Sequence, residues 1–158
     1  MQEKTAPVFV VATANDVSSL PPEFLRKGRF DEIFSVDLPS HSERKEIFDI
    51  VIRGTTPSRG HLLDNKSINL DTLAEATKGY SGAEIRAAVE EAMVSAFDAG
   101  KDLNLLDLMD SVKGSRPLSE TMKEKIDKLR AWCGDRARPA NAKDPMSETR
   151  PMGRMMDN

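Results

Sequence analysis

The sequence of 158 residues is poor in cysteine, in aromatic side chains and in long apolar runs. Its single cysteine, Cys133, excludes an internal disulfide bond and a cysteine-rich zinc site. The longest apolar run, Val8 to Ala12, is far shorter than the roughly 20 residues that a membrane-spanning helix requires. The first residues contain no basic segment that leads into an apolar stretch, unlike a signal peptide. We therefore expect a reduced, soluble, intracellular protein without a membrane span.

Net charge and hydropathy limit the possible partners. Lysine and arginine number 23 and aspartate and glutamate 26, which gives a net charge of −3. This balance argues against a general electrostatic attraction to nucleic acid or to an anionic membrane. Apolar residues make up 39 % of the chain and the mean hydropathy is −0.47. We therefore expect a folded part followed by a polar tail.

The sequence also lacks the usual residues for holding a nucleoside triphosphate. It contains no G-x-x-x-x-G-K-[ST], whose amides and lysine cradle phosphates. No apolar strand ends in paired carboxylates for Mg²⁺, because the run that begins at Val8 leads into Asn15 and Asp16. His41 and His61 have no partner at helical spacing, so we expect no metal site. The chain alone is not expected to bind triphosphate and metal in the usual manner.

Apolar periodicity divides the chain into a strand region and a helical region. Val8–Ala12 and Ile33–Leu38 read as buried strands, and a short helix is expected over 23–26. Two buried strands cannot form a sheet with two covered faces, so we expect that structure N-terminal of Pro7 is missing from this plan. From Ser42 the period becomes helical and predicts four to five helices as far as Cys133. We divide the chain into 1–41, a helical unit at 42–134 and a disordered tail at 135–158.

The clearest helix begins at Ser81. Ser81 and Glu84 have the three-residue spacing of a capping box, which satisfies two backbone donors at a helix start. A single apolar stripe follows at i, i+3, i+4, i+7 spacing, formed by Ile85, Ala88, Val89, Ala92, Met93, Ala96 and Phe97. Arg86 is placed to pair with Glu90, four residues further on.

Three segments carry the functional signal: 12–16 after the first strand, 25–31 before the second, and 79–86 at the start of the long helix. In this order they resemble the second region of homology and the lid of AAA+ ATPases, especially the uncharacterised AAA proteins encoded in plastids and cyanobacteria. The resemblance covers about residues 5 to 140. It implies an α/β remnant, two strands of a P-loop parallel sheet, followed by an all-α AAA+ lid. In that sheet the P-loop strand lies between these two strands, so alone they lack their main hydrogen-bond partner.

The resemblance assigns roles to five residues. Asn15 matches sensor 1, which helps to place the attacking water; the alternative is a simple turn. Arg26 and Arg29 match arginine fingers, whose guanidinium groups stabilise charge on a neighbouring subunit's nucleotide; the alternative is a solvated basic helix end. Gly82 and Ala83 match lid residues that approach the adenine and ribose, a role compatible with ordinary helix capping.

The resemblance implies the C-terminal part of an AAA+ ATPase whose complete module uses ATP and Mg²⁺ to remodel a protein client. Other AAA+ subunits are the implied partners, commonly in a hexameric ring, in the cytoplasm or the plastid stroma. Whether this chain is itself an enzyme stays open, because it lacks the P-loop. The alternative is a non-enzymatic adaptor that docks on intact AAA subunits. A third hypothesis, a DNA-binding helix-turn-helix over 73–94, is disfavoured because Glu84, Glu90 and Glu91 would repel phosphates.

Overall fold

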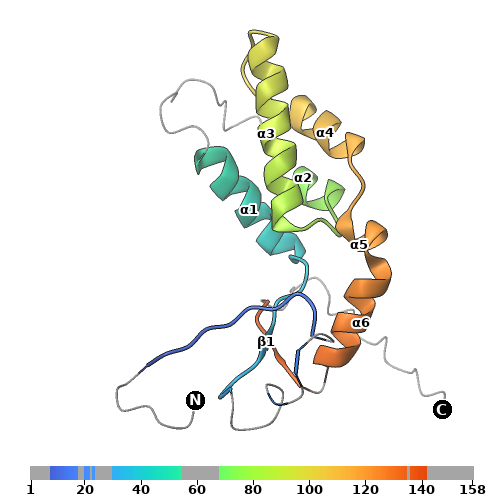
Figure 1. The fold of residues 1–158 in the computed structure, drawn as a ribbon. Coiled ribbons are helices and arrows are strands. Elements are labelled where there is room, and N and C mark those ends of the chain that lie inside the picture. Colours follow the sequence, from blue (N-terminus) through green and yellow to red (C-terminus); the bar gives the residue numbers. More distant parts are fainter. Residues whose placement is uncertain are drawn as a thin grey trace, which may run out of the picture.

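A computed structural model of the chain describes residues 8–17, 20–21, 23, 30–54, 68–134 and 136–141. Four helices, α1 to α4, pack together at one end of the molecule, the two strands lie at the other end, and α6 runs between them (Figure 1). The elements in chain order are β1 (Phe34–Ser35), α1 (His41–Gly54), α2 (Leu70–Ala76), α3 (Gly82–Asp98), α4 (Leu105–Gly114), α5 (Leu118–Thr121), α6 (Lys123–Cys133) and β2 (Arg138–Pro139).

Three of the four helices in the bundle, α2, α3 and α4, have a side-chain cap at their N-terminus. The capping box predicted for Ser81 and Glu84 is present at the start of α3. Asn69 accepts hydrogen bonds from the Asp71 and Thr72 N–H groups at the start of α2. Asn104 forms a second capping box with Asp107 at the start of α4. These caps satisfy donors that no helical carbonyl can reach, so they define where each helix begins.

The hydrophobic core lies among α1 to α4. α3 packs against α1 and α4, and α2 packs against α1 and α4. The side chains at its centre are fully buried and come from all four helices: Phe48, Leu73, Ile85, Val89 and Leu108. In contrast, α5 and α6 contribute no buried residue among those described. The bundle is therefore the part of the described chain that is stabilised by its own core.

The predicted fold class, two parallel strands and a helical unit, is confirmed, but one of the two strands differs from the prediction. Residues 8–12 form no strand, and Phe9 and Val11 are 92 % and 75 % exposed. Ile33–Leu38 shortens to β1, which pairs in parallel with β2. The prediction for Val8–Ala12 was wrong because an apolar run forms a strand only beside a partner, and no strand among the described residues pairs with it.

The expectation of a disordered tail from residue 135 is wrong for residues 136–141. The Arg138 N–H donates to Ile33 O at 2.8 Å, and the Ala140 N–H donates to Ser35 O at 2.9 Å. Pro139 lies between these two donors, where its missing N–H costs no ladder bond. Local composition did not indicate this segment because its partner lies about a hundred residues earlier in the chain. Residues 142–158 lie outside the described residues.

Two further predictions concern helices. The helical region expected to end at Cys133 is interrupted at Met122, whose φ of −122° and ψ of 26° are not helical, so its last part forms the two helices α5 and α6. The short helix expected over 23–26 lies outside the described residues except for Glu23. No helix in the described part of the chain combines the length and apolar character needed to cross a membrane.

The core predicts a contrast between two leucines of α4. Leu108 is fully buried, whereas Leu106 is 72 % exposed. Leu108→Ala should reduce the free energy of unfolding by about 2–5 kcal/mol, because it removes buried methyl groups and leaves a cavity. Leu106→Ala, with the same change in chemistry and helix propensity, should stay within about 0.5 kcal/mol of the wild type. Urea denaturation followed by circular dichroism measures both, and equal losses would contradict the assignment of the core.

Candidate functional site

The turn before α3 places the predicted lid residues Gly82 and Ala83. Gly79 has a φ of +84°, a left-handed conformation that favours glycine, and it redirects the chain after α2. The Ser81 N–H donates to Glu84 Oε2 at 2.7 Å, and the Glu84 N–H donates to Ser81 Oγ at 3.3 Å. The capping box thus uses the amides that flank Gly82 and Ala83. Like all first-turn amides, those of Gly82 and Ala83 have no acceptor within the helix.

Packing inside the chain does not require the small size of Gly82. A Cβ at this position would lie 3.6 Å from Ile47 Cδ1, which is an ordinary van der Waals contact. Gly82 is half-buried, and Ala83 next to it is exposed. The surface at the start of α3 is therefore accessible, and its small residues permit a molecule to approach the backbone closely.

Tyr80 anchors this turn to the end of α4. Its side chain is buried, and its hydroxyl lies 2.9 Å from the carbonyl oxygens of Val112 and Ser115 and from Ser115 Oγ. On the other side, the Ser119 N–H donates to Gly79 O at 3.3 Å. The turn is thus held between the bundle and the start of α5.

Arg44 ties the connection between β1 and α1 to the lid. Its side chain is buried, with Nε donating to Ala74 O at 2.9 Å and Nη1 donating to Pro39 O at 2.8 Å. Ala74 lies in the last turn of α2, whose carbonyl groups carry partial negative charge. A single guanidinium therefore joins Pro39, two residues before α1, to the last turn of α2.

Asp37 is the second anchor of the same connection. Arg130 of α6 binds it with two hydrogen bonds, Nε to Oδ2 and Nη2 to Oδ1, both 2.8 Å long. Partial burial raises the pKa of Asp37, but the hydrogen bond from Arg130, that from the Leu38 N–H and the charge of Arg130 outweigh it. The net pKa of Asp37 therefore lies below its ordinary value. The hydrogen bond that Arg130 donates to Asp37 outweighs the partial burial of Arg130 and raises the pKa of that guanidinium.

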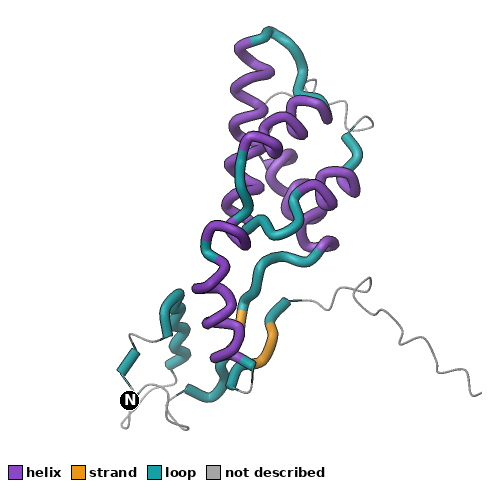
Figure 2. Tube along the Cα trace, turned by 90° about the vertical axis from the view of Figure 1, so that its right-hand side faces the viewer, coloured by secondary structure: helices purple, strands orange, loops and turns teal. Residues whose placement is uncertain are grey.

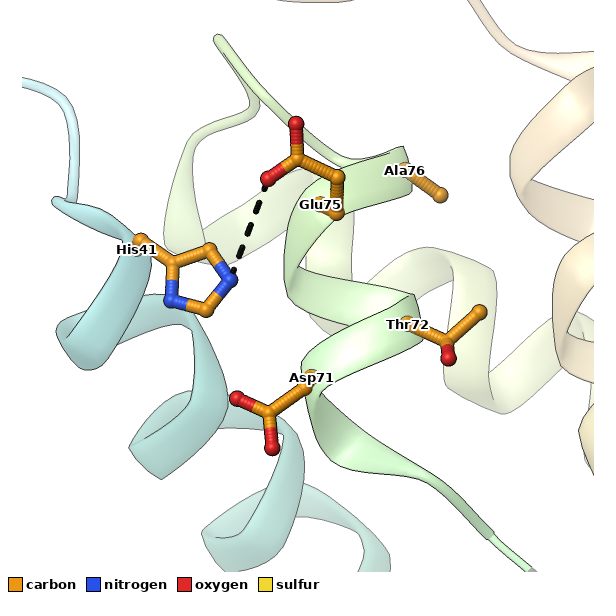
Figure 3. A pocket seen from close by; sticks show the side chains of 5 residues that line it. All are labelled: His41, Asp71, Thr72, Glu75 and Ala76. Atoms are coloured by element: carbon orange, nitrogen blue, oxygen red, sulfur yellow. Dashed lines mark ion pairs between the residues drawn. The ribbon is translucent and has the colours of Figure 1, made fainter.

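A shallow hollow lies between the start of α1 and α2. It is lined by His41, Asp71, Thr72, Glu75 and Ala76, and His41 Nε2 lies 3.9 Å from Glu75 Oε2 (Figure 3). The view shows the imidazole facing the Glu75 carboxylate, while Thr72 points away from His41. The described residues include no group of three or more histidine, cysteine or acidic side chains suited to a metal ion. Among the described residues, the hollow therefore brings an imidazole close to a carboxylate but offers no ligand set for a metal ion.

Of the five predicted site residues, the structure places two, Gly82 and Ala83, in a regular element. Gly82 and Ala83 lie in the first turn of α3, as the motif indicates. Asn15 is exposed in an irregular segment, while Arg26 and Arg29 lie outside the described residues. The predicted pair of Arg86 and Glu90 is present, with 3.9 Å between Nη1 and Oε1.

Sequence reasoning missed the residues that organise the connection between β1 and α1: Arg44, Asp37, Arg130 and Asn141. Arg44 lies on a helix that was correctly expected, but its burial is opposite to what a charged residue indicates. The partners Asp37 and Arg130 are separated by 93 residues. No local pattern in a single sequence reports bonds at that separation.

The comparisons with known proteins agree with this architecture. Residues 67–110, which span α2, α3 and most of α4, match the family model for the AAA+ lid domain. The uncharacterized AAA domain-containing protein ycf46 of Pyropia yezoensis is 44 % identical over 142 residues, or 89 % of this chain. The chain belongs to the AAA+ family.

More distant AAA+ proteins are similar to the same region. The proteasome-activating nucleotidase of Saccharolobus solfataricus is 34 % identical over 125 residues, which cover 77 % of this chain. The crystal structure of the FIGL-1 AAA domain in complex with ADP matches 69 % of this chain and 39 % of its own, with a TM-score of 0.54 and 23 % identity. The second match shows a shared fold alone.

The chain spans only 28 % of the length of the Pyropia relative and 30 % of that of the nucleotidase. The AAA+ fold and lid are thus shown for this chain, which matches less than a third of the length of either relative.

The turn before α3 predicts unequal costs for two glycine substitutions. A Cβ at Gly79 would overlap Ser119 Oγ, whereas a Cβ at Gly100, also left-handed with a φ of +64°, would meet no atom within 4 Å. Gly100→Ala should cost only the left-handed conformation, about 1–2 kcal/mol. Gly79→Ala should cost more, because Ser119 must also move. Thermal unfolding of the two variants measures this difference, and a smaller loss at Gly79 would contradict the contact.

The lowered pKa of Asp37 predicts an acid-dependent loss of stability. Since the folded pKa lies below the unfolded value of 3.8, the stabilisation is fully present above that value and disappears as pH falls through the folded pKa. Asp37→Asn should therefore reduce stability by up to about 1 kcal/mol at neutral pH, with the magnitude typical of an exposed ion pair. The difference from wild type should shrink once the pH falls below 3.8. Urea denaturation across the acidic range tests this, and a difference independent of pH would refute it.

Proposed function

We propose that the chain supplies the lid and one side of the nucleotide site to an AAA+ module that couples ATP hydrolysis to remodelling of a protein client. The observation that carries this proposal is the AAA+ lid fold with small residues at the start of α3. In this proposal the complete module uses ATP and Mg²⁺. It works among other AAA+ subunits, in the cytoplasm or the plastid stroma.

Gly82 and Ala83 are proposed to face the adenine and ribose. Three features support this role: Ala83 is exposed, Gly82 has no packing requirement inside the chain, and the first-turn amides lack helical acceptors. The AAA domain of FIGL-1, which shares the fold, was crystallised with ADP. A bulky side chain at Ala83 would then obstruct the nucleotide.

Asn15, Arg26 and Arg29 are proposed to act during hydrolysis. The Asn15 side chain would help to position the attacking water as sensor 1. The guanidinium groups of Arg26 and Arg29 would neutralise charge that develops on the phosphates in a neighbouring subunit. A finger that acts across subunits requires an oligomer, and a hexameric ring is the form that we propose.

The triphosphate and Mg²⁺ would be held by residues outside this sequence, because the 158 residues contain no G-x-x-x-x-G-K-[ST]. The relatives are more than three times as long as the part that they share with this chain. The module that hydrolyses ATP is therefore larger than the chain described.

A chimera tests the proposal. The corresponding 125-residue region of the Saccharolobus solfataricus nucleotidase is replaced with the matching part of this chain, and ATP hydrolysis is measured. Arg26→Ala or Arg29→Ala should each lower kcat by at least about 10³-fold if it removes a finger. Ala83→Leu should instead raise KM for ATP about tenfold, which corresponds to roughly 1.4 kcal/mol of lost binding. Arg53→Ala, on the exposed surface of α1, is the matched control and should leave both constants unchanged.

Mixing subunits distinguishes a finger from a structural arginine. Arg29→Ala chimeras combined with subunits whose P-loop lysine is replaced should recover part of the activity, because each supplies what the other lacks. If neither Arg26→Ala nor Arg29→Ala changes the rate of ATP hydrolysis, the proposal is rejected. If the unmodified chain co-purifies with intact AAA subunits but ATP hydrolysis does not depend on Arg26 or Arg29, the adaptor hypothesis is favoured instead. The exposed Phe9, Val11, Phe34 and Val36 offer an apolar surface for such docking.

A further inference from the structure

The C-terminal segment from α5 to Asn141, described over residues 118–134 and 136–141, connects two distant parts of the molecule. We call it the C-terminal strap. Its first residues lie beside the turn before α3, and α6 then extends from the helical bundle to the strands at the other end (Figures 1 and 2). There it meets residues 36–40, the segment between β1 and α1, which we call the hinge segment. The strap thus spans from the candidate nucleotide-facing turn to the hinge segment.

At the hinge segment, the strap binds Asp37 through both backbone and side chain. Asn141 Oδ1 accepts from the Asp37 N–H at 2.6 Å, and Asn141 Nδ2 lies 3.3 Å from Asp37 O. Asn141 Nδ2 also donates to Glu43 Oε2 at 3.2 Å, which joins the first turn of α1 to the same group. Arg130 adds its two hydrogen bonds to the Asp37 carboxylate.

At the bundle, the strap is fixed beside Gly79. Ser119 donates its N–H to Gly79 O and lies so close to the glycine Cα that a Cβ there would not fit. Ser115, three residues before α5, is held by the Tyr80 hydroxyl. A movement of the strap would therefore change the contacts of the turn that carries Gly82 and Ala83.

Between these two attachments no side chain of α5 or α6 is fully buried, although Ile126, Leu129 and Trp132 of α6 are half-buried. Arg130 and Asp37 are both about half-exposed. The turn after α6 has a local contact, in which the Arg136 guanidinium lies 5.7 Å from the centre of the Trp132 ring. Exposed polar contacts are individually weak and are screened by salt, so such an attachment is reversible, unlike a packed core.

We propose that the C-terminal strap is a reversible latch, which holds the lid at one angle to β1 while Arg130 binds Asp37 and releases the hinge segment when that pair separates. The latch has two states, and the bundle keeps its own core in both. It is a property of this chain and does not depend on the proposed function. Any group that competes for Arg130, or higher ionic strength, shifts the population toward the released state.

Hydrogen exchange on the full chain tests the latch locally. Arg130→Gln should accelerate exchange of the Arg138 and Ala140 amides, which donate to β1, by about threefold to fivefold, as expected for the loss of an exposed ion pair. Amides within α3 should be unchanged, because the bundle does not open. Equal acceleration in α3 would show global destabilisation and overturn the latch, as would no acceleration at β2. Arg53→Gln, which breaks the exposed pair of Arg53 with Asp49 at 2.8 Å in α1, is the matched control and should change neither region.

A distance measurement tests the change of angle. Spin labels at Val36→Cys and Val94→Cys, both exposed sites, are placed in a Cys133→Ser background. Wild-type sequence should give one narrow distance distribution, and Arg130→Gln or raised salt should broaden it or add a second population. The exchanged pair Asp37→Arg with Arg130→Asp should restore the narrow distribution. A distribution unchanged by Arg130→Gln, or one equally broad in the wild type, would overturn the proposal.

Discussion

The buried guanidinium of Arg44 is the interaction on which the arrangement of the lid depends. It lies where the hinge segment enters α1 and where α2 ends, and it donates to carbonyl groups from both, Pro39 O and Ala74 O. A charge in such a place is costly unless hydrogen bonds replace the water it has lost. Once those bonds form, the direction in which α1 leaves the hinge and the position of α2 are no longer independent. The core between α1, α2 and α3 is then built around helices whose relative positions are already limited.

The lid was predictable because its information is local. The capping box of Ser81 and Glu84, and the apolar stripe behind it, lie within one helix and describe α3 correctly. The same applies to the cap that Asn69 provides to α2. The segments at 12–16, 25–31 and 79–86, taken together and in this order, resemble AAA+ ATPases, and the match of residues 67–110 to the AAA+ lid family model confirms the lid.

The strands and the strap were not predictable for the opposite reason. Val8–Ala12 has the composition of a buried strand, but strand formation depends on a neighbour, and no described residue supplies one. Arg138–Pro139 has little strand propensity, yet it pairs with β1 because Arg130 and Asn141 hold the chain beside Asp37. The site divides in the same way. Gly82 and Ala83 follow from a motif, whereas Asp37 and Arg130 are brought together only by the fold, and the roles of Asn15, Arg26 and Arg29 stay predictions.

A parallel pair of two-residue strands is too short to be stable by itself. Phe34 in β1 and Val36 directly after it are both exposed, so hydrophobic burial adds little to the stability of the strand pair. The bonds of Arg130 and Asn141 to Asp37 therefore stabilise the strand pair, and not the reverse. It follows that the lid is joined to the strand side of this chain by two different devices. Arg44 is buried and holds the helices of the lid through hydrogen bonds that are shielded from water, while Arg130 is exposed and holds the strap through contacts that water and salt can replace.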